Sequence, residues 1–152
     1  MKTAAEIMDA DVPTVSPDAD ARAAIEMLAK TELGAVAVVD EDRKVVGIVS
    51  ESDLILSEEE SDLHLPHYLN IMGGIVFVGS MKGFEERLDK AFATKVSELM
   101  TADPVVVHDY ASAETVARTI AEKHHNHLPV VDGDGRLAGM VTRADALAAL
   151  VE

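Results

Sequence analysis

The stretch GMVTRADAL, residues 139–147, has a near copy in GIVSESDLI, residues 47–55. In each copy a glycine lies in an apolar run, a hydroxyl residue follows, and an aspartate comes three residues after the hydroxyl. The copies lie 92 residues apart, and the same offset continues upstream without a gap. Identical pairs at this offset are Glu6 and Glu98, Met8 and Met100, Asp11 and Asp103, Ala21 and Ala113, Val38 and Val130, Asp40 and Asp132, and Asp53 and Asp145. The chain is therefore interpreted as a tandem duplication.

Each unit predicts the element order β-α-β-β-α. A polar turn leads into a helical pattern of apolar residues that starts at Ala21 in the first unit and at Ala113 in the second. Two short apolar strands joined by a turn follow, and a second helix begins at the repeated motif. One such unit is too small to close a core. We therefore predict an α/β (α+β) fold with two units, 1–55 and 94–152, packed sheet against sheet about a pseudo-twofold axis, and a connector at 56–93.

Composition limits the class of protein. The chain has 152 residues, 48% of them hydrophobic, which is enough for one compact domain with its own core. It has no cysteine, which excludes disulfides, thiolate catalysis and cysteine-ligated zinc. The formal net charge of −15 disfavours nucleic acid as a partner. Because the apolar runs are too short to span a bilayer and the N-terminus is acidic, we expect a soluble cytoplasmic protein with no membrane partner.

The hydroxyl and the carboxylate of the repeated motif have two interpretations. Ser50 with Asp53, and Thr142 with Asp145, have nearly the spacing of a capping box at a helix start. The same strand-to-helix turn exposes backbone N–H groups that can bind a phosphate. The glycine earlier in the strand leaves room for a flat base or for close approach of another backbone. Capping and ligand binding can coexist, so both interpretations stay open.

The motif G-h-h-[ST]-x-x-D in both units, where h is apolar, and LPVVD-x-x-G-x-h-x-G in the second unit resemble a tandem CBS domain pair, also called a Bateman module. The resemblance covers residues 1–55 and 94–152. It implies that adenosine ligands (AMP, ADP, ATP, and sometimes S-adenosylmethionine or NAD) bind in clefts between the two units. It also assigns the aspartate to the ribose, and the serine or threonine to the ribose or the phosphate.

The resemblance extends ligand roles to further positions. In the first unit these are a hydroxyl at Ser16 and a small residue at Ala21; in the second unit Ala113 matches, but His108 replaces the hydroxyl. Adenine is expected against Leu33, Ala35 and Val36 in one site and against His125, His127 and Leu128 in the other. The predicted ligand-binding residues are Ser16, Ala21, Ala35, Val36, Ser50, Asp53, Val107, His108, Ala113, His127, Leu128, Pro129, Thr142, Arg143 and Asp145.

The two sites are predicted to differ in charge. The residue after the hydroxyl is Glu51 in the first unit and Arg143 in the second. A phosphate is repelled by a carboxylate and attracted by a guanidinium group. We therefore expect phosphorylated nucleotides at the site of Thr142 and Asp145. The first site is expected to be weaker, to take an unphosphorylated ligand, or to be empty.

Histidines cluster in the second unit, at His108, His124, His125 and His127. Clustered imidazoles suggest a metal site, but the spacing does not give an i, i+4 helical pair and no cysteine joins them. Contact with a nucleotide, or a solvated turn, is the favoured interpretation, and we predict no metal site.

Residues 56–93 have no counterpart in the repeat. Their second half places Phe84, Leu88, Ala91 and Phe92 on one face of a predicted short helix. An apolar stretch of this kind is expected to be covered. We favour structural use or a dimer contact over a lid.

The main functional hypothesis is a non-catalytic energy sensor that binds AMP, ADP or ATP and acts as a homodimer on an unknown effector protein. No cofactor beyond this ligand is expected. An enzyme is disfavoured because the sequence has no recognisable catalytic triad, Gly-rich phosphate loop or metal motif. A structural module without a ligand stays open because of Glu51 and His108. Binding of S-adenosylmethionine or NAD also stays open, and a metal sensor is less favoured.

Overall fold

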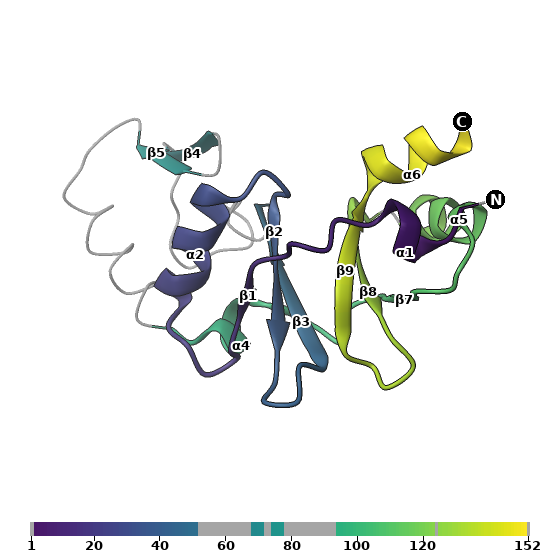
Figure 1. Cartoon of the computed structure of the whole chain (residues 1–152). Helices are drawn as coiled ribbons and strands as arrows, with labels where there is room; N and C mark the ends of the chain where they lie inside the picture. Colours follow the sequence, from purple (N-terminus) through teal and green to yellow (C-terminus); the bar gives the residue numbers. More distant parts are fainter. Residues whose placement is uncertain (1, 52–67, 72–73, 78–93, 124, 152) are drawn as a thin grey trace.

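The computed structural model describes residues 2–51, 68–71, 74–77, 94–123 and 125–151 (Figure 1). Its helices and strands, in chain order, are α1 (Ala4–Ile7), β1 (Thr14–Val15), α2 (Ala21–Lys30), β2 (Ala35–Val39), β3 (Val45–Ser50), β4 (Tyr68–Ile71), β5 (Gly74–Phe77), α4 (Val96–Leu99), β6 (Thr101–Ala102), β7 (Val107–His108), α5 (Ala113–Lys123), β8 (His127–Val131), β9 (Leu137–Thr142) and α6 (Arg143–Leu150). Within the described residues, no helix combines the length and the apolar character needed to cross a membrane.

The predicted element order is confirmed where it can be followed. The second repeat has the order β7-α5-β8-β9-α6, and the first has β1-α2-β2-β3. The second helix predicted for the first repeat, which includes Asp53, lies outside the described residues, as does the helix predicted around Phe84. In the connector, β4 and β5 pair as a separate two-stranded antiparallel sheet.

Each repeat contributes one main sheet. The strand orders are β1-β2-β3-β6 and β7-β8-β9. In both sheets the first strand runs parallel to the second, to which the intervening helix connects it. The second and third strands form an antiparallel hairpin. The hairpin register pairs Ala35 with Ser50 and His127 with Thr142. The hydroxyl of each repeated motif therefore lies beside the first residue of the preceding strand.

The two sheets face each other, with helices on their outer sides (Figure 1). Between the sheets lies a cluster with members from both repeats, including Ala37, Ile48 and Met140. On the outer side of the first sheet, Leu28 of α2 packs in a cluster with Val36 of β2. A corresponding outer cluster in the second repeat joins α5 and α6 to β8 and β9. Because β2 and β8 are covered on both faces, they appear in the sequence as continuous apolar runs.

Contacts between equivalent residues confirm the pseudo-twofold relation. Lys44 and Arg136, which are 92 residues apart, form an antiparallel bridge with each other at the two hairpin turns. Two residues related by the repeat can pair with each other in this way only where the axis passes between them. The prediction that the repeats pack sheet against sheet is therefore confirmed.

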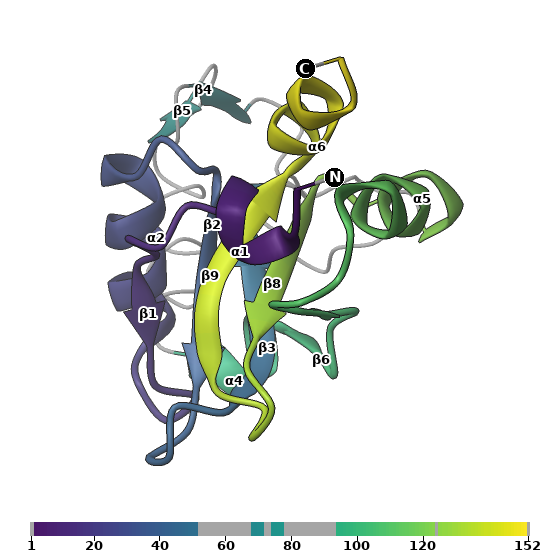
Figure 2. The ribbon, with the colours of Figure 1, turned by 45° about the vertical axis from the view of Figure 1, so that its right-hand side comes forward.

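The leading segment of each repeat packs on the other repeat. Helix α1 lies beside β9 (Figure 2), and Ala4 is fully buried in the core of the second repeat. Helix α4 occupies the equivalent place on the first repeat, where Val96 is fully buried. The boundaries 1–55 and 94–152 follow the duplication in sequence. In the packed structure, however, the leading segment of each repeat, which contains α1 or α4, belongs to the core of the other repeat.

The glycine of the repeated motif lies where the exchanged segment crosses the sheet. A Cβ atom at Gly139 would lie 2.7 Å from the carbonyl oxygen of Asp9. At Gly47, it would lie 3.1 Å from the carbonyl oxygen of Thr101. Close backbone approach, one of the two reasons considered for this glycine, therefore accounts for it in both repeats.

Candidate functional site

The hydroxyl and carboxylate of the second repeat form a capping box at the start of α6. The Thr142 hydroxyl accepts a hydrogen bond from the backbone N–H of Asp145 at 3.2 Å. Asp145 Oδ2 accepts one from the backbone N–H of Thr142 at 3.1 Å. These bonds hold both side chains at the end of β9. Among the described residues, Asp145 Oδ1 accepts no hydrogen bond.

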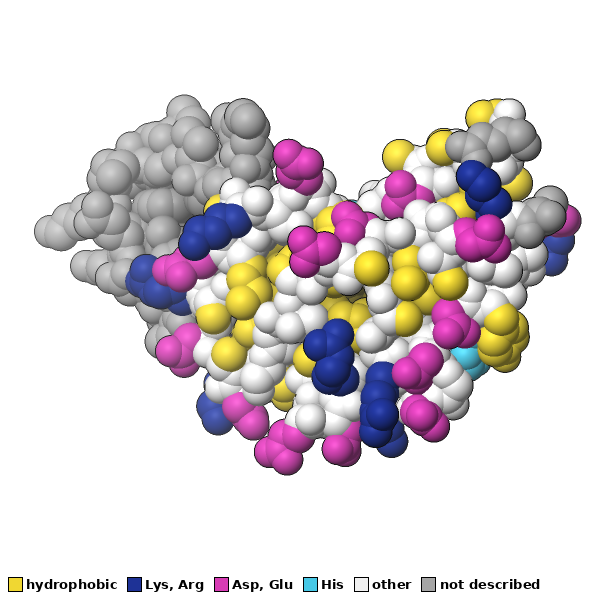
Figure 3. Space-filling model, viewed as in Figure 1, with side chains coloured by type: hydrophobic (Ala, Val, Ile, Leu, Met, Phe, Trp, Pro, Cys, Tyr) yellow, Lys and Arg dark blue, Asp and Glu magenta, His cyan; other side chains and the backbone are white. Residues whose placement is uncertain are grey.

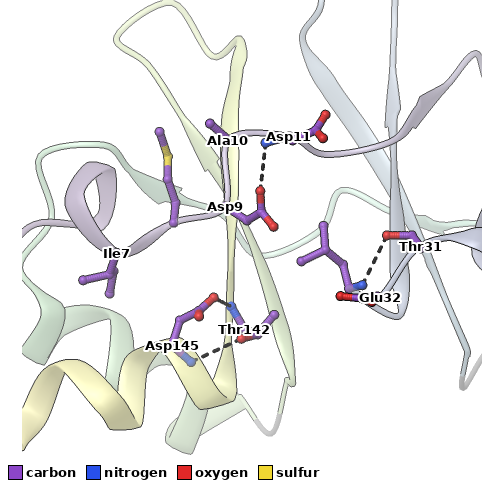
Figure 4. Close-up of a pocket in the computed structure, with 10 residues that line it drawn as sticks. Ile7, Asp9, Ala10, Asp11, Thr31, Glu32, Thr142 and Asp145 are labelled. Atoms are coloured by element: carbon purple, nitrogen blue, oxygen red, sulfur yellow. Dashed lines mark hydrogen bonds between the residues drawn. The ribbon is translucent and has the colours of Figure 1, made fainter.

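The same pair lines an open pocket between the two repeats (Figure 4). Its volume is about 770 Å³, within the range of small-molecule sites. Figure 4 shows Thr142 and Asp145 on one side, Thr31 and Glu32 on the facing side, and the chain at Asp9 crossing above. The described lining residues are Ile7, Met8, Asp9, Ala10, Asp11, Thr31, Glu32, Leu33, Thr142 and Asp145.

The pocket is assembled from segments that are distant in sequence. One wall is the start of α6, and the facing wall is the turn after α2, residues 31–33. Residues 7–11 reach the pocket because the exchanged leading segment crosses the second sheet at Gly139. A ligand in this pocket therefore contacts both repeats at once.

His127 connects the two walls. In the β8–β9 ladder it pairs with Thr142, and its Nε2 donates a hydrogen bond to the carbonyl oxygen of Leu33 on the facing wall. Because a carbonyl oxygen only accepts, the ring carries its proton on Nε2. Burial lowers the pKa of His127, and this outweighs the opposite effects of the Leu33 carbonyl and the Glu51 carboxylate. The imidazole is therefore neutral at neutral pH.

Ser16 and His108 do not lie at this pocket. Because β1 is parallel to β2, Ser16 follows β1 at the carboxyl end of β2, whereas Ser50 pairs with Ala35 at the amino end. His108 lies at the corresponding far end of the second sheet, where its ring stacks on Tyr110 with centroids 5.1 Å apart. Ser16, predicted for the site of the first unit, and His108, predicted for that of the second, therefore do not line this pocket, and their contacts with a ligand stay a prediction.

Most of the other predicted residues are buried in the core and do not line the pocket. They are apolar side chains of strands or of the first helical turn, and their contacts with a ligand stay a prediction. These residues are Ala21, Ala35, Val36, Val107, Ala113, Leu128 and Pro129.

Arg143 and His125 line a different depression, of about 390 Å³, between α5 and α6. Side chains two residues apart on a helix point about 200° apart, so Arg143 faces away from the pocket that Asp145 lines. Leu33, expected in the first site, instead lies on the wall opposite Thr142. The turn after α2 in the first repeat thus lies at the motif of the second repeat, because the two repeats pack about the twofold axis.

Thr31, Glu32 and residues 7–11 were not predicted as site residues. A signal for residues 7–11 was present in the sequence: MDAD at 8–11 is repeated as MTAD at 100–103. The recurring MDAD/MTAD motif belongs to no predicted strand or helix, so packing in the core did not explain it. The position of residues 8–11 at the pocket gives this motif a role in the second repeat's site.

The corresponding site of the first repeat is only partly described. Ser50 is half-buried at the end of β3, and Asp53 lies outside the described residues. In the described part of the chain, no group of three or more His, Cys, Asp or Glu side chains is placed to hold a metal ion.

Comparison with known proteins identifies the family. The sequence model of the CBS domain family matches residues 4–59 and 96–152. The chain therefore belongs to the CBS domain family, as a tandem pair with an intervening segment.

Relatives and solved structures agree with this assignment. The protein MJ1426 of Methanocaldococcus jannaschii is 32% identical over 142 residues, which are 90% of this chain and 84% of that protein. The chloroplastic CBS domain-containing protein CBSX1 of Arabidopsis thaliana is 30% identical over 93% of this chain, but the chain spans only 60% of its length. The crystal structure of CBSX2 in complex with AMP has a TM-score of 0.71 and 27% identity, and the alignment covers 99% of this chain and 97% of that chain.

Proposed function

We propose that this chain is a non-catalytic regulatory module that binds an adenosine nucleotide in the cleft between its two repeats. The observation that carries the proposal is the pocket of about 770 Å³ in which Thr142 and Asp145 of one repeat face residues 31–33 of the other. The relative CBSX2, of similar fold, has been crystallised with AMP. That structure supports an adenosine ligand for a cleft of this kind.

The geometry suggests how the adenosine part is held. Asp145 is fixed by Thr142 through Oδ2, so Oδ1 is available for the hydroxyls of a ribose. Ile7, Met8 and Leu33 supply apolar surface for a flat base. Because these groups belong to two repeats, the ligand stabilises one arrangement of the repeats over others, and a partner protein responds to the change in population. Ser50 with Asp53 is proposed as the equivalent pair of the second cleft, and the acting unit as a homodimer.

A thermal-shift and calorimetric screen with AMP, ADP, ATP, S-adenosylmethionine and NAD tests this proposal. A ligand at a hundred times its Kd adds about 2.7 kcal/mol to the free energy of unfolding, which is roughly 5–10 °C for a chain of this size. Asp145→Ala is expected to abolish the part of the shift that comes from the cleft of Thr142 and Asp145. Asp134→Ala, which removes an exposed carboxylate in a hairpin turn far from the pocket, is the control and keeps it. Absence of a shift with every adenosine compound would contradict the proposal.

A further inference from the structure

The pocket of Thr142 and Asp145 is acidic. Among its described lining residues, four are carboxylates, namely Asp9, Asp11, Glu32 and Asp145, and none is lysine or arginine. Within the described residues, none of the four forms an ion pair. Figure 3 shows acidic side chains on both sides of the notch at the top of this face, between the two halves of the molecule. Negative charge in the pocket is therefore not neutralised by the described residues.

The acidity belongs to this cleft and not to the repeat in general. At the equivalent sequence positions, 92 residues later, Asp9 is replaced by Thr101, Thr31 by Lys123 and Glu32 by a histidine. The duplication has thus kept Asp11 and Asp145 as Asp103 and Asp53 in the other unit, whereas Asp9 and Glu32 have no carboxylate at their equivalent positions. The aspartate proposed to bind the ribose is common to both repeats. The residues that differ between the repeats are therefore expected to contact the part of the ligand other than adenosine.

A phosphate group in this pocket would be strongly disfavoured. Each of the carboxylates repels it across the short distances inside a pocket, and the net charge of −15 adds to that repulsion at low salt. Arg143, the expected phosphate partner, lines the other depression. A positive charge on the ligand, in contrast, gains attraction from the same carboxylates.

We infer that this cleft selects an adenosine ligand that brings positive charge to these carboxylates, and discriminates against a free phosphate. The inference rests on the proposed function, because it assumes that the cleft binds adenosine. The positive charge is carried either by a cationic 5′ substituent of the ligand or by a divalent cation bound to its phosphates. Both sources satisfy the same carboxylates, and experiment separates them.

Calorimetry at low salt on the full chain tests the inference with four probes. These are adenosine, 5′-amino-5′-deoxyadenosine (protonated at neutral pH), AMP with EDTA, and AMP with Mg²⁺. Binding that is lost in Asp145→Asn is assigned to this cleft, since asparagine keeps the capping oxygen but loses the charge. At this cleft the amino compound is expected to bind about tenfold more tightly than AMP with EDTA, with adenosine between them. Recovery of AMP binding with Mg²⁺ identifies the cation as a source; no recovery leaves the cationic substituent as the source.

A variant that removes two of the carboxylate charges tests whether the carboxylates cause this order of affinities. Asp9→Asn with Glu32→Gln is expected to weaken the amino compound, strengthen AMP by about threefold or more, and leave adenosine unchanged. Asp18→Asn with Glu26→Gln removes the same two charges from exposed positions that do not line the pocket, and should alter none of these. Equal or tighter binding of AMP with EDTA at the Asp145-dependent cleft would overturn the inference. Failure of adenosine itself to bind there would instead overturn the proposed function.

Discussion

At the scale of single residues, the repeated hydroxyl and carboxylate have two uses at one position. Thr142 and Asp145 exchange hydrogen bonds that cap α6, and both also line the pocket between the repeats. Capping holds the Asp145 carboxylate in one orientation. A ligand that binds there does not need to order that side chain, which lowers the entropic cost of binding.

Gly139→Ala is expected to destabilise the fold by about 1–3 kcal/mol, the usual cost of overpacking. The added Cβ would lie 2.7 Å from the Asp9 carbonyl oxygen and against the Met8 sulfur, so the crossing segment has to shift. Urea unfolding measures the change in free energy. Gly133→Ala is the matched control, because a Cβ atom there meets nothing within 4 Å. Equal stability of the two variants would show that the crossing is not tightly packed in solution.

At the scale of elements, β8 carries a contact that couples the repeats to pH. His127 is part of the second sheet, but its imidazole donates to the Leu33 carbonyl at the end of the turn after α2. The contact therefore fixes the spacing between the two pocket walls through one side chain. Protonation of that ring places a charge in a half-buried location.

The free energy of unfolding is expected to fall as the pH drops below about 6.5, the ordinary pKa of histidine. The pKa of His127 is lowered in the folded state by burial. The unfolded chain therefore takes up the proton first, and stability is lost between pH 6.5 and the lowered folded pKa. Urea unfolding between pH 5 and 8 measures this loss.

His127→Gln should remove this part of the pH dependence, since glutamine can donate to Leu33 without titrating. The control is His125→Gln, which changes an exposed histidine two residues earlier. The same pH dependence in His127→Gln and in the native chain would assign the effect to other groups.

At the scale of the whole molecule, each repeat is completed by a segment of the other. Helix α1 covers the second sheet, and the exchanged segment α4–β6 extends the first. The two repeats therefore depend on each other for a closed core. The ligand pocket lies where these exchanged parts meet.

Ala4→Glu is expected to destabilise the chain by about 3 kcal/mol or more, because it buries an unpaired charge. Ala4 is fully buried in the core of the second repeat, although it lies at the start of the chain. Hydrogen exchange should show lost protection first in α5, β8 and β9, and only later in α2 and β2. Ala5→Glu, the same change at the adjacent exposed position, serves as the control and should be close to neutral. Loss of protection in the first repeat before the second would contradict the exchanged packing.

The sequence by itself determined the duplication, the element order and the capping turn. These depend on local features: the 92-residue offset, the apolar periodicity of α2 and α5, and the hydroxyl followed three residues later by an aspartate. The sequence also predicted that the two sheets face each other, because one repeat is too small to close a core by itself. The duplication follows from comparing the two halves of the sequence, and the element order and the capping turn depend on patterns within one repeat.

Only the tertiary structure decided which residues share the pocket. The far position of Ser16 follows from the parallel pairing of β1 with β2, and the place of Leu33 opposite Thr142 follows from the twofold packing. Asp9 reaches the site because its segment crosses to the other repeat. These are contacts between segments far apart in sequence, fixed by strand direction and sheet packing, so no local pattern specifies them.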